Sequence, residues 1–306
     1  MDTVRTIGVV MNGGGMRGAY GAGVLAALEQ LMGREPLNVL VGNSAGAGIV
    51  CGLLAIGSER MKQFWTKQIK RGDFIPHFKN SKEFRGALKM IMNELGIRMP
   101  WMQDKYKTAN VRWFTDIDYL MEACRKVGFS NEAMRKAKTQ VYISVTRADT
   151  GMAHFFSGKD DVFEAFHASV SIPIVSKTPV IVEGIPCLDG GISVTLRELI
   201  DKALTEGAEK VVVVDLSSPL NPLERWGLRR YAKRQREGLK NAIIRMTEAE
   251  HPERLAPDAR VYLIRPRETM VTRLRFSLEK LQATYERGLS ETLNDYNLKA
   301  FLNVVN

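Results

Sequence analysis

The stretch IGVVMNGGGMRGAYGAGVL, residues 7–25, decides the fold because a run of glycines joins an apolar strand pattern to a helical pattern. Gly13, Gly15 and Gly18 stand in the spacing GxGxxG, which is typical of a loop that presents backbone N–H groups to negative charge. Two interpretations are open. The loop binds the pyrophosphate of a dinucleotide, or it uses the same backbone geometry toward another anion.

The second strand pattern separates these interpretations. A dinucleotide-binding fold requires Asp or Glu at the end of that strand, about 20 residues further on, to hold the ribose hydroxyls. Here the strand NVLVG at 38–42 continues into NSAG, and the nearest acids, Glu29 and Glu35, precede it. The sequence therefore disfavours a dinucleotide site.

The second strand instead leads into a GxSxG motif formed by Gly42, Asn43, Ser44, Ala45 and Gly46. Between a strand and a helix, this motif makes a sharp turn that projects the serine side chain. Ser44 is therefore a candidate nucleophile, with Gly42 and Gly46 allowing the turn. The alternative is a serine that only caps the N-terminus of the following helix.

The two motifs are expected to face each other. A strand, a helix and a second strand joined by a right-handed crossover lie parallel, with their carboxyl ends at the same edge of the sheet. The loop from Gly13 to Gly18 then lies beside Ser44, where its N–H groups can stabilise an oxyanion formed by serine attack on a carbonyl. This pairing favours a serine acyl hydrolase over a structural turn.

Further strand patterns alternate with helical ones, which predicts an α/β fold with a mostly parallel sheet covered on both faces. These strands are expected at 140–146, 210–216 and 260–266, with a hairpin to a shorter strand at 153–157. A helical insertion is expected around 60–135 and a long helix at about 275–302 that packs on the sheet. We predict a single domain over 1–306, with the motifs in a core of about 5–220 and helices in 221–306.

The proton acceptor for Ser44 is not settled by spacing. The four histidines are His77, His154, His167 and His251. Asp215 and His251 could complete a Ser-Asp-His order, although His251 precedes the last strand. Asp189, before two glycines, is the other candidate; it needs a dry pocket or direct contact with Ser44 to act as a base. A DGG tight turn is the structural alternative.

Three segments resemble, in order and spacing, the motif blocks of the patatin-like phospholipase family. They are NGGGMRGAYGAGVL, VGNSAGA and HASVSIPIVSKTPVIVEGIPCLDGG, within residues 7–191. The resemblance implies a three-layer α/β/α sandwich and a Ser-Asp dyad without histidine. It makes Ser44 the nucleophile and Asp189 its activator, and it implies no metal or organic cofactor. The implied oxyanion residues are Gly13, Gly14, Gly15, Arg17 and Gly18; the remaining motif glycines are Gly42, Gly46, Gly190 and Gly191.

The chain carries a net charge of +10, and residues 223–245 hold eight Arg or Lys against two Glu. Their spacing predicts one amphipathic helix with Leu228, Ala232, Leu239, Ile243 and Met246 on its apolar face. Such a helix suits an anionic membrane surface, and it equally suits solvent. Because no nucleic-acid motif accompanies the charge, we expect no nucleic-acid partner.

Three widely spaced cysteines indicate a reducing compartment, and neither a signal peptide nor a membrane-spanning run is expected. The expected location is the cytoplasm, with possible contact at the inner face of a membrane. The expected function is a serine lipid acyl hydrolase that releases fatty acid through an acyl-enzyme. A general carboxylesterase or thioesterase, and a weakly active lipid-binding regulatory protein, are the alternatives.

Overall fold

The computed structural model describes residues 6–32, 37–69, 81–97, 117–174, 176, 178–249, 255–266, 271 and 277–304. Eight strands in these residues form one sheet, with the order β5-β6-β3-β2-β1-β7-β8 and with β4 paired to β3. The strands are β1 (Ile7–Met11), β2 (Val39–Asn43), β3 (Gln140–Arg147), β4 (Ala153–Ser157), β5 (Val180–Val182), β6 (Ile185–Asp189), β7 (Lys210–Val214) and β8 (Val261–Ile264). The pairs along β3-β2-β1-β7-β8 are parallel, while β4, β5 and β6 run antiparallel to their neighbours. The mostly parallel sheet and the hairpin of β3 and β4 were both predicted, and both are confirmed.

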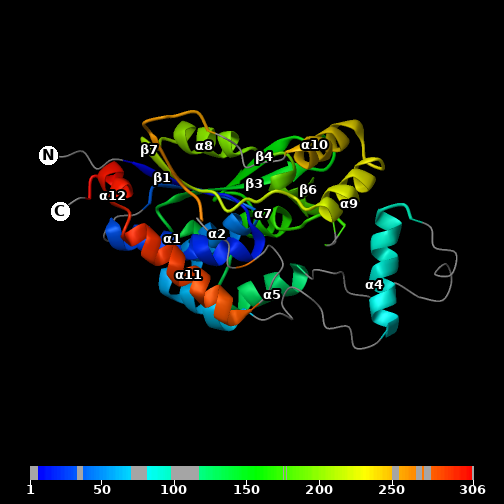
Figure 1. The fold of residues 1–306 in the computed structure, drawn as a ribbon, viewed down its shortest axis with the longest axis horizontal. Helices are drawn as coiled ribbons and strands as arrows, with labels where there is room; N and C mark the ends of the chain where they lie inside the picture. The colour runs from blue at the N-terminus through cyan, green and yellow to red at the C-terminus, as the bar shows by residue number, and fades with distance from the viewer. Residues whose placement is uncertain are drawn as a thin grey trace.

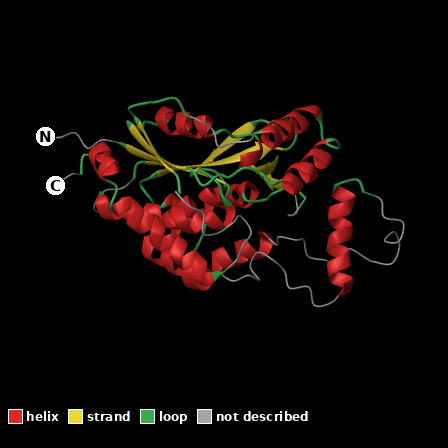
Figure 2. Cartoon of the chain, viewed as in Figure 1, coloured by secondary structure: helices red, strands yellow, loops and turns green. Residues whose placement is uncertain are grey.

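Helices cover both faces of this sheet (Figures 1 and 2). Successive residues of a strand point to opposite faces of the sheet. The apolar strands β1 and β7 therefore contribute side chains to two separate cores. Val9 and Met11 pack in the core beneath α1 and α2, whereas Val10 packs with the residues of α8 on the other face. The predicted three-layer arrangement is confirmed.

The helical elements differ in role according to the core that they enter. Those that share the larger core are α1 (Gly18–Leu31), α2 (Ala45–Gln63), the π-helical turn η2 (Phe64–Gln68), α5 (Ile117–Val127), α6 (Asn131–Arg135), α7 (Val162–Ser169), α11 (Leu278–Leu293) and α12 (Tyr296–Leu302). The opposite face is covered by α8 (Leu196–Thr205). A third cluster joins α9 (Pro222–Ala232) and α10 (Glu237–Glu248) to the end of α4 (Ser81–Glu94). Short 3-10 turns, η1 (Gly15–Arg17) and η4 (Gly190–Ile192), contain glycines of the GxGxxG and DGG segments.

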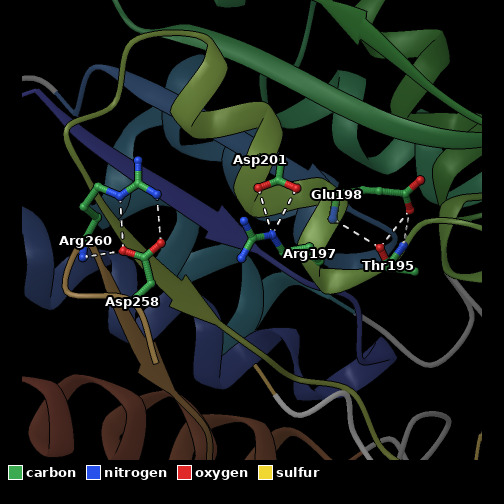
Figure 3. A network of polar contacts seen from close by, with 6 residues as sticks. All are labelled: Thr195, Arg197, Glu198, Asp201, Asp258 and Arg260. Atoms are coloured by element: carbon green, nitrogen blue, oxygen red, sulfur yellow. Dashed lines mark hydrogen bonds and ion pairs between the residues drawn. The ribbon is translucent and has the colours of Figure 1, made fainter. Parts of the chain in front are cut away.

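The first turn of α8 is fixed by a network of polar contacts on the face of the sheet opposite α1 and α2 (Figure 3). Thr195 and Glu198 form a reciprocal capping box at the helix start. From the same turn, Arg197 pairs with Asp201, four residues along the helix, at 2.9 Å. The Arg197–Asp201 pair lies at the surface of α8, with both side chains about half exposed.

The expected long helix at 275–302 is wrong in two respects. The chain forms α11 and α12 with a break between them, because the Asp295 side chain accepts the N–H of Leu298 and starts a new helix. In addition, α11 packs on α1 rather than on the sheet (Figure 1). Gly23 and Gly288 make this possible, since a Cβ on either would collide with a backbone carbonyl of the other helix.

The single amphipathic helix expected at 223–245 is also wrong. The chain turns at 233–236, where Arg236 has extended backbone angles, and α9 and α10 fold against each other. Leu228 and Ala232 pack against Leu239 and Ile243 in one cluster, as the apolar periodicity indicated. The predicted apolar face is buried, but tertiary packing divides it between two helices.

The insertion around 60–135 is helical where it is described. It contains the end of α2, η2, α4, α5 and α6, while residues 70–80 and 98–116 lie outside the described ranges. Gly57 takes φ 76° inside α2, so this helix bends there before it enters the insertion. Within the ranges given above, no helix has the length and apolar character needed to cross a bilayer. The single-domain organisation over 1–306 stays a prediction.

Candidate active site

Ser44 lies on the sharp turn between β2 and α2, with φ 51° and ψ −126°. Positive φ is strained for a residue with a side chain, so the surroundings must hold this conformation. The two motif glycines allow close packing around the turn. A Cβ on Gly42 would lie 2.6 Å from the Cα of Ala47, and one on Gly46 would collide with the carbonyl of Met11. The backbone therefore exposes the serine in a geometry that larger neighbours would prevent.

Asp189 ends β6 and meets Ser44 directly. The hydroxyl of Ser44 donates to Oδ2 of Asp189 at 2.8 Å, and the N–H of Gly191 donates to Oδ1 at 2.8 Å. The carboxylate belongs to a residue that is only 6% exposed. Its backbone is fixed as well, because the Thr146 hydroxyl donates to its carbonyl and its N–H donates to the carbonyl of Ser171. The DGG segment thus holds a buried carboxylate against Ser44.

The glycine loop passes next to Ser44, as the spacing indicated. A Cβ on Gly13 would lie 2.6 Å from the Cβ of Ser44, so any side chain there would push on the serine. The N–H of Gly13 already donates to Oδ1 of Asn12 at 2.8 Å. In the described ranges, the N–H groups of Gly14 and Gly15 have no acceptor, and Gly15 takes φ 58°. Both glycines therefore have donors that remain available to a ligand.

Arg17 and Gly18, which the resemblance also assigned to the oxyanion site, have packing partners in the structure. Arg17 donates from Nη1 to the carbonyl of Ser217 at 3.2 Å and more weakly to that of Leu216. Gly18 starts α1 where a Cβ would lie 2.7 Å from the ring of Trp65. Both residues therefore hold the loop against its neighbours.

A buried polar network behind the loop was not anticipated. Asn12 accepts from Nδ2 of Asn43 at 2.9 Å and donates to Oδ1 of Asp215 at 3.0 Å. Arg265 pairs with Oδ2 of Asp215 at 2.8 Å. The network links the ends of β1, β2 and β7, because each polar residue follows an apolar strand. That position was the available signal, but the partners are far apart in sequence.

The histidine alternative finds no support in the described ranges. Asp215, its proposed acid, contacts Asn12 and Arg265, and His251 lies outside the described residues, as does His77. His167 contacts Glu164 and Asp118 instead. His154 stacks edge-on against Phe156, and burial lowers the pKa of its imidazole. Within the same ranges, no group of three or more His, Cys, Asp or Glu side chains could hold a metal ion.

The chain is similar to several known proteins. The family model described as patatin-like phospholipase matches residues 9–200. The uncharacterized protein YjjU of Escherichia coli (strain K12) is 25% identical over 215 residues, which cover 68% of this chain and 51% of YjjU. The chain thus spans about half the length of this curated relative. Among solved structures, VipD from Legionella pneumophila aligns with a TM-score of 0.45 and 13% identity, over 98% of this chain and 67% of VipD.

Proposed function

Because the chain belongs to the patatin-like phospholipase family, we propose that it is a serine lipid acyl hydrolase with Ser44 as nucleophile and Asp189 as its base. The observation that carries the proposal is the 2.8 Å hydrogen bond from the Ser44 hydroxyl to the Asp189 carboxylate, made by a serine on a strained turn. A nucleophile within hydrogen-bond reach of a base that is itself oriented by a third group is the arrangement that covalent catalysis requires. Here the N–H of Gly191 orients the carboxylate.

The reaction proceeds in two halves. Ser44 Oγ attacks the ester carbonyl while its proton passes to Oδ2 of Asp189, and the resulting oxyanion accepts from the N–H groups of Gly14 and Gly15. Collapse of this intermediate returns the proton to the leaving alcohol and leaves an acyl-enzyme. Asp189 then removes a proton from water, which attacks the acyl group, and the fatty acid leaves as Ser44 regains its proton. None of these steps requires a cofactor.

Release of free fatty acid tests the proposal. The wild-type protein and Ser44→Ala are incubated with phospholipid vesicles and, separately, with a water-soluble carboxylic ester and a thioester. The wild type is expected to release fatty acid from phospholipid, and Ser44→Ala is expected to release none above background. Hydrolysis of the water-soluble substrates alone indicates a general esterase or thioesterase. If the folded wild type hydrolyses no substrate, the result supports a lipid-binding regulatory protein.

Peripheral contact with an anionic membrane is part of this proposal, but two arginines of α9 have partners within the protein. Arg225 donates to the carbonyls of Thr247 and Ala249 at the end of α10. Arg230 donates to the carbonyl of Leu95, just after α4. Cations near helix C-termini stabilise the helices. Part of the basic charge of this region is therefore explained by packing.

Two exposed apolar side chains on α9 support the membrane contact independently. Leu223 is 74% exposed and Trp226 is 47% exposed, and the i, i+3 spacing places them on one face of α9. The Arg230 guanidinium lies 5.6 Å from the centre of the Trp226 ring. Apolar side chains flanked by basic ones suit insertion at the surface of an anionic bilayer.

Replacing both Leu223 and Trp226 by alanine is expected to weaken binding to anionic vesicles about tenfold, because the apolar area buried in the bilayer is lost. Sedimentation with vesicles measures this binding. Tyr296→Ala is the control, since Tyr296 is 69% exposed on α12 at the other end of the molecule (Figure 1). Equal binding of the wild type to neutral and anionic vesicles at low salt would contradict the contact.

The compartment is proposed from the cysteines. Cys51, Cys124 and Cys187 are widely spaced in the sequence, and all three are buried. Few, widely spaced cysteines are typical of a reducing compartment, which supports a cytoplasmic location.

A further inference from the structure

The backbone of Ser44 is held by a side chain that the proposed reaction does not use. At φ 51° the turn is strained, and a conformation of this kind persists only where its surroundings fix it. The Ser44 N–H donates to Oγ of Ser169 at 2.8 Å, over a separation of 125 residues. The hydroxyl of Ser169 in turn donates to the carbonyl of Ser144 at 2.7 Å.

Ser169 connects the Ser44 turn to a strand in the interior of the sheet. It is the last residue of α7 and is completely buried, and Ser144 lies in the middle of β3, between β2 and β4. Its single hydroxyl uses a lone pair and its proton in two bonds, one to the strained turn and one to the sheet. A buried hydroxyl with both bonds satisfied fixes the distance between the groups that it joins.

The same segment also fixes the second member of the pair. The carbonyl of Ser171, two residues after Ser169, accepts the N–H of Asp189 at 3.1 Å. Residues 169–171 therefore contact the backbone of Ser44 on one side and the backbone of Asp189 on the other. Their position sets how closely Ser44 Oγ and the Asp189 carboxylate approach each other.

We infer that Ser169 is a positioning residue that holds the Ser44 turn in its reactive conformation, an inference that rests on the proposed function. A second consequence concerns the oxyanion. Because the N–H of Ser44 already donates to Ser169, it is engaged in holding the turn, and the oxyanion is stabilised by other donors, among them those of Gly14 and Gly15. A misplacement of reacting atoms by about 1 Å can cost on the order of 10²-fold in rate.

The test compares Ser169→Ala with Ser169→Cys and with a matched control. Thr292→Ala also removes a buried hydroxyl, but that hydroxyl bonds the carbonyl of Gly288 within α11. For each variant we would measure kcat and KM on a water-soluble ester, the rate of inactivation by a fluorophosphonate, and the midpoint of thermal unfolding. Ser44→Ala is run in the same assay.

Ser169→Ala is expected to lower kcat and the inactivation rate at least about tenfold, with KM within about threefold of the wild type. Ser169→Cys, which keeps a weaker acceptor and donor, is expected to fall between the wild type and Ser169→Ala. Thr292→Ala is expected to keep the wild-type kcat even where its unfolding midpoint falls. A purely structural role predicts that kcat follows the unfolding midpoint instead.

A kcat for Ser169→Ala within about twofold of the wild type would overturn the inference. If Ser169→Ala does not fold, the inactivation rate of Ser169→Cys decides: a slower rate supports the inference, and the wild-type rate overturns it. These outcomes are distinct from failure of the proposed function, which appears as activity remaining in Ser44→Ala.

Discussion

Asp189→Asn is expected to lower kcat for ester hydrolysis by about 10²- to 10⁴-fold, which is the usual contribution of a general base. The amide keeps the size of the carboxylate, and its oxygen can still accept the N–H of Gly191. It cannot take the proton of Ser44, so the loss should appear in kcat while KM stays within about threefold. Steady-state kinetics on a water-soluble ester measures both constants.

A matched control distinguishes the effect of losing the proposed base from the effect of losing one negative charge elsewhere in the protein. Asp201→Asn removes a carboxylate that pairs with Arg197 on the surface of α8 (Figure 3), the helix that covers the sheet face opposite α1 and α2. Its kcat is expected to equal that of the wild type. If folded Asp189→Asn retains more than about a tenth of the wild-type kcat, Asp189 is not the base.

Asp215→Ala is expected to lower the free energy of unfolding by about 3 kcal/mol, because it breaks a buried ion pair. The Asp215 side chain is 1% exposed and accepts from Arg265, Asn12 and the N–H of Ser217. The loss is placed at the low end of the usual range because Arg265 is one-third exposed and can be hydrated in the variant. Chemical denaturation monitored by circular dichroism gives the free energy of unfolding.

The control for this loss is an ion pair on the surface. Glu132 and Lys136 pair at 2.8 Å with both side chains largely exposed, and the hydrogen bond to Lys136 lowers the pKa of the Glu132 carboxyl. Glu132→Ala is expected to leave the free energy of unfolding close to that of the wild type, because both charges of this pair are solvated. Equal small changes in both variants would show that the Asp215 network contributes little to stability.

The parallel strands of the central sheet were predictable because they are short apolar runs whose residues enter both cores. Val9 and Val10 illustrate this, since adjacent residues of one strand enter opposite sides. The positions at which the helices break were harder to predict from the sequence. The pattern of 223–245 stays amphipathic across the turn at 233–236, and only the packing of α9 on α10 shows where the chain reverses.

The contact between Ser44 and Asp189 also combines a part that local sequence predicts with a part that only the tertiary structure determines. The turns before Ser44 and after Asp189 are visible as local glycine motifs, and the resemblance to a family paired them. Their contact spans 145 residues and depends on register: Asn43 pairs with Ser144, and Val145 pairs with Asp189, so β3 brings the two ends together. Spacing alone did not decide whether Asp189 or a Ser-Asp-His arrangement with His251 accepts the proton of Ser44.

The polar residues that support the site could not be predicted for a related reason. Asn12, Asn43 and Ser169 each have one neighbour in the motifs and one partner from a distant strand. A buried polar side chain is stable only when its partners are in place, and the sequence does not state which partners the fold supplies. Residues of this kind become visible only in the three-dimensional structure.

Covalent labelling tests the central claim most directly. A fluorophosphonate reacts with an activated serine, so mass spectrometry of the labelled wild type should find the adduct on Ser44. Ser44→Ala should remain unlabelled, Asp189→Asn should be labelled only slowly, and His251→Ala should be labelled at the wild-type rate. Absence of an adduct on Ser44 in the folded wild type, or loss of labelling in folded His251→Ala, would contradict a Ser44–Asp189 dyad.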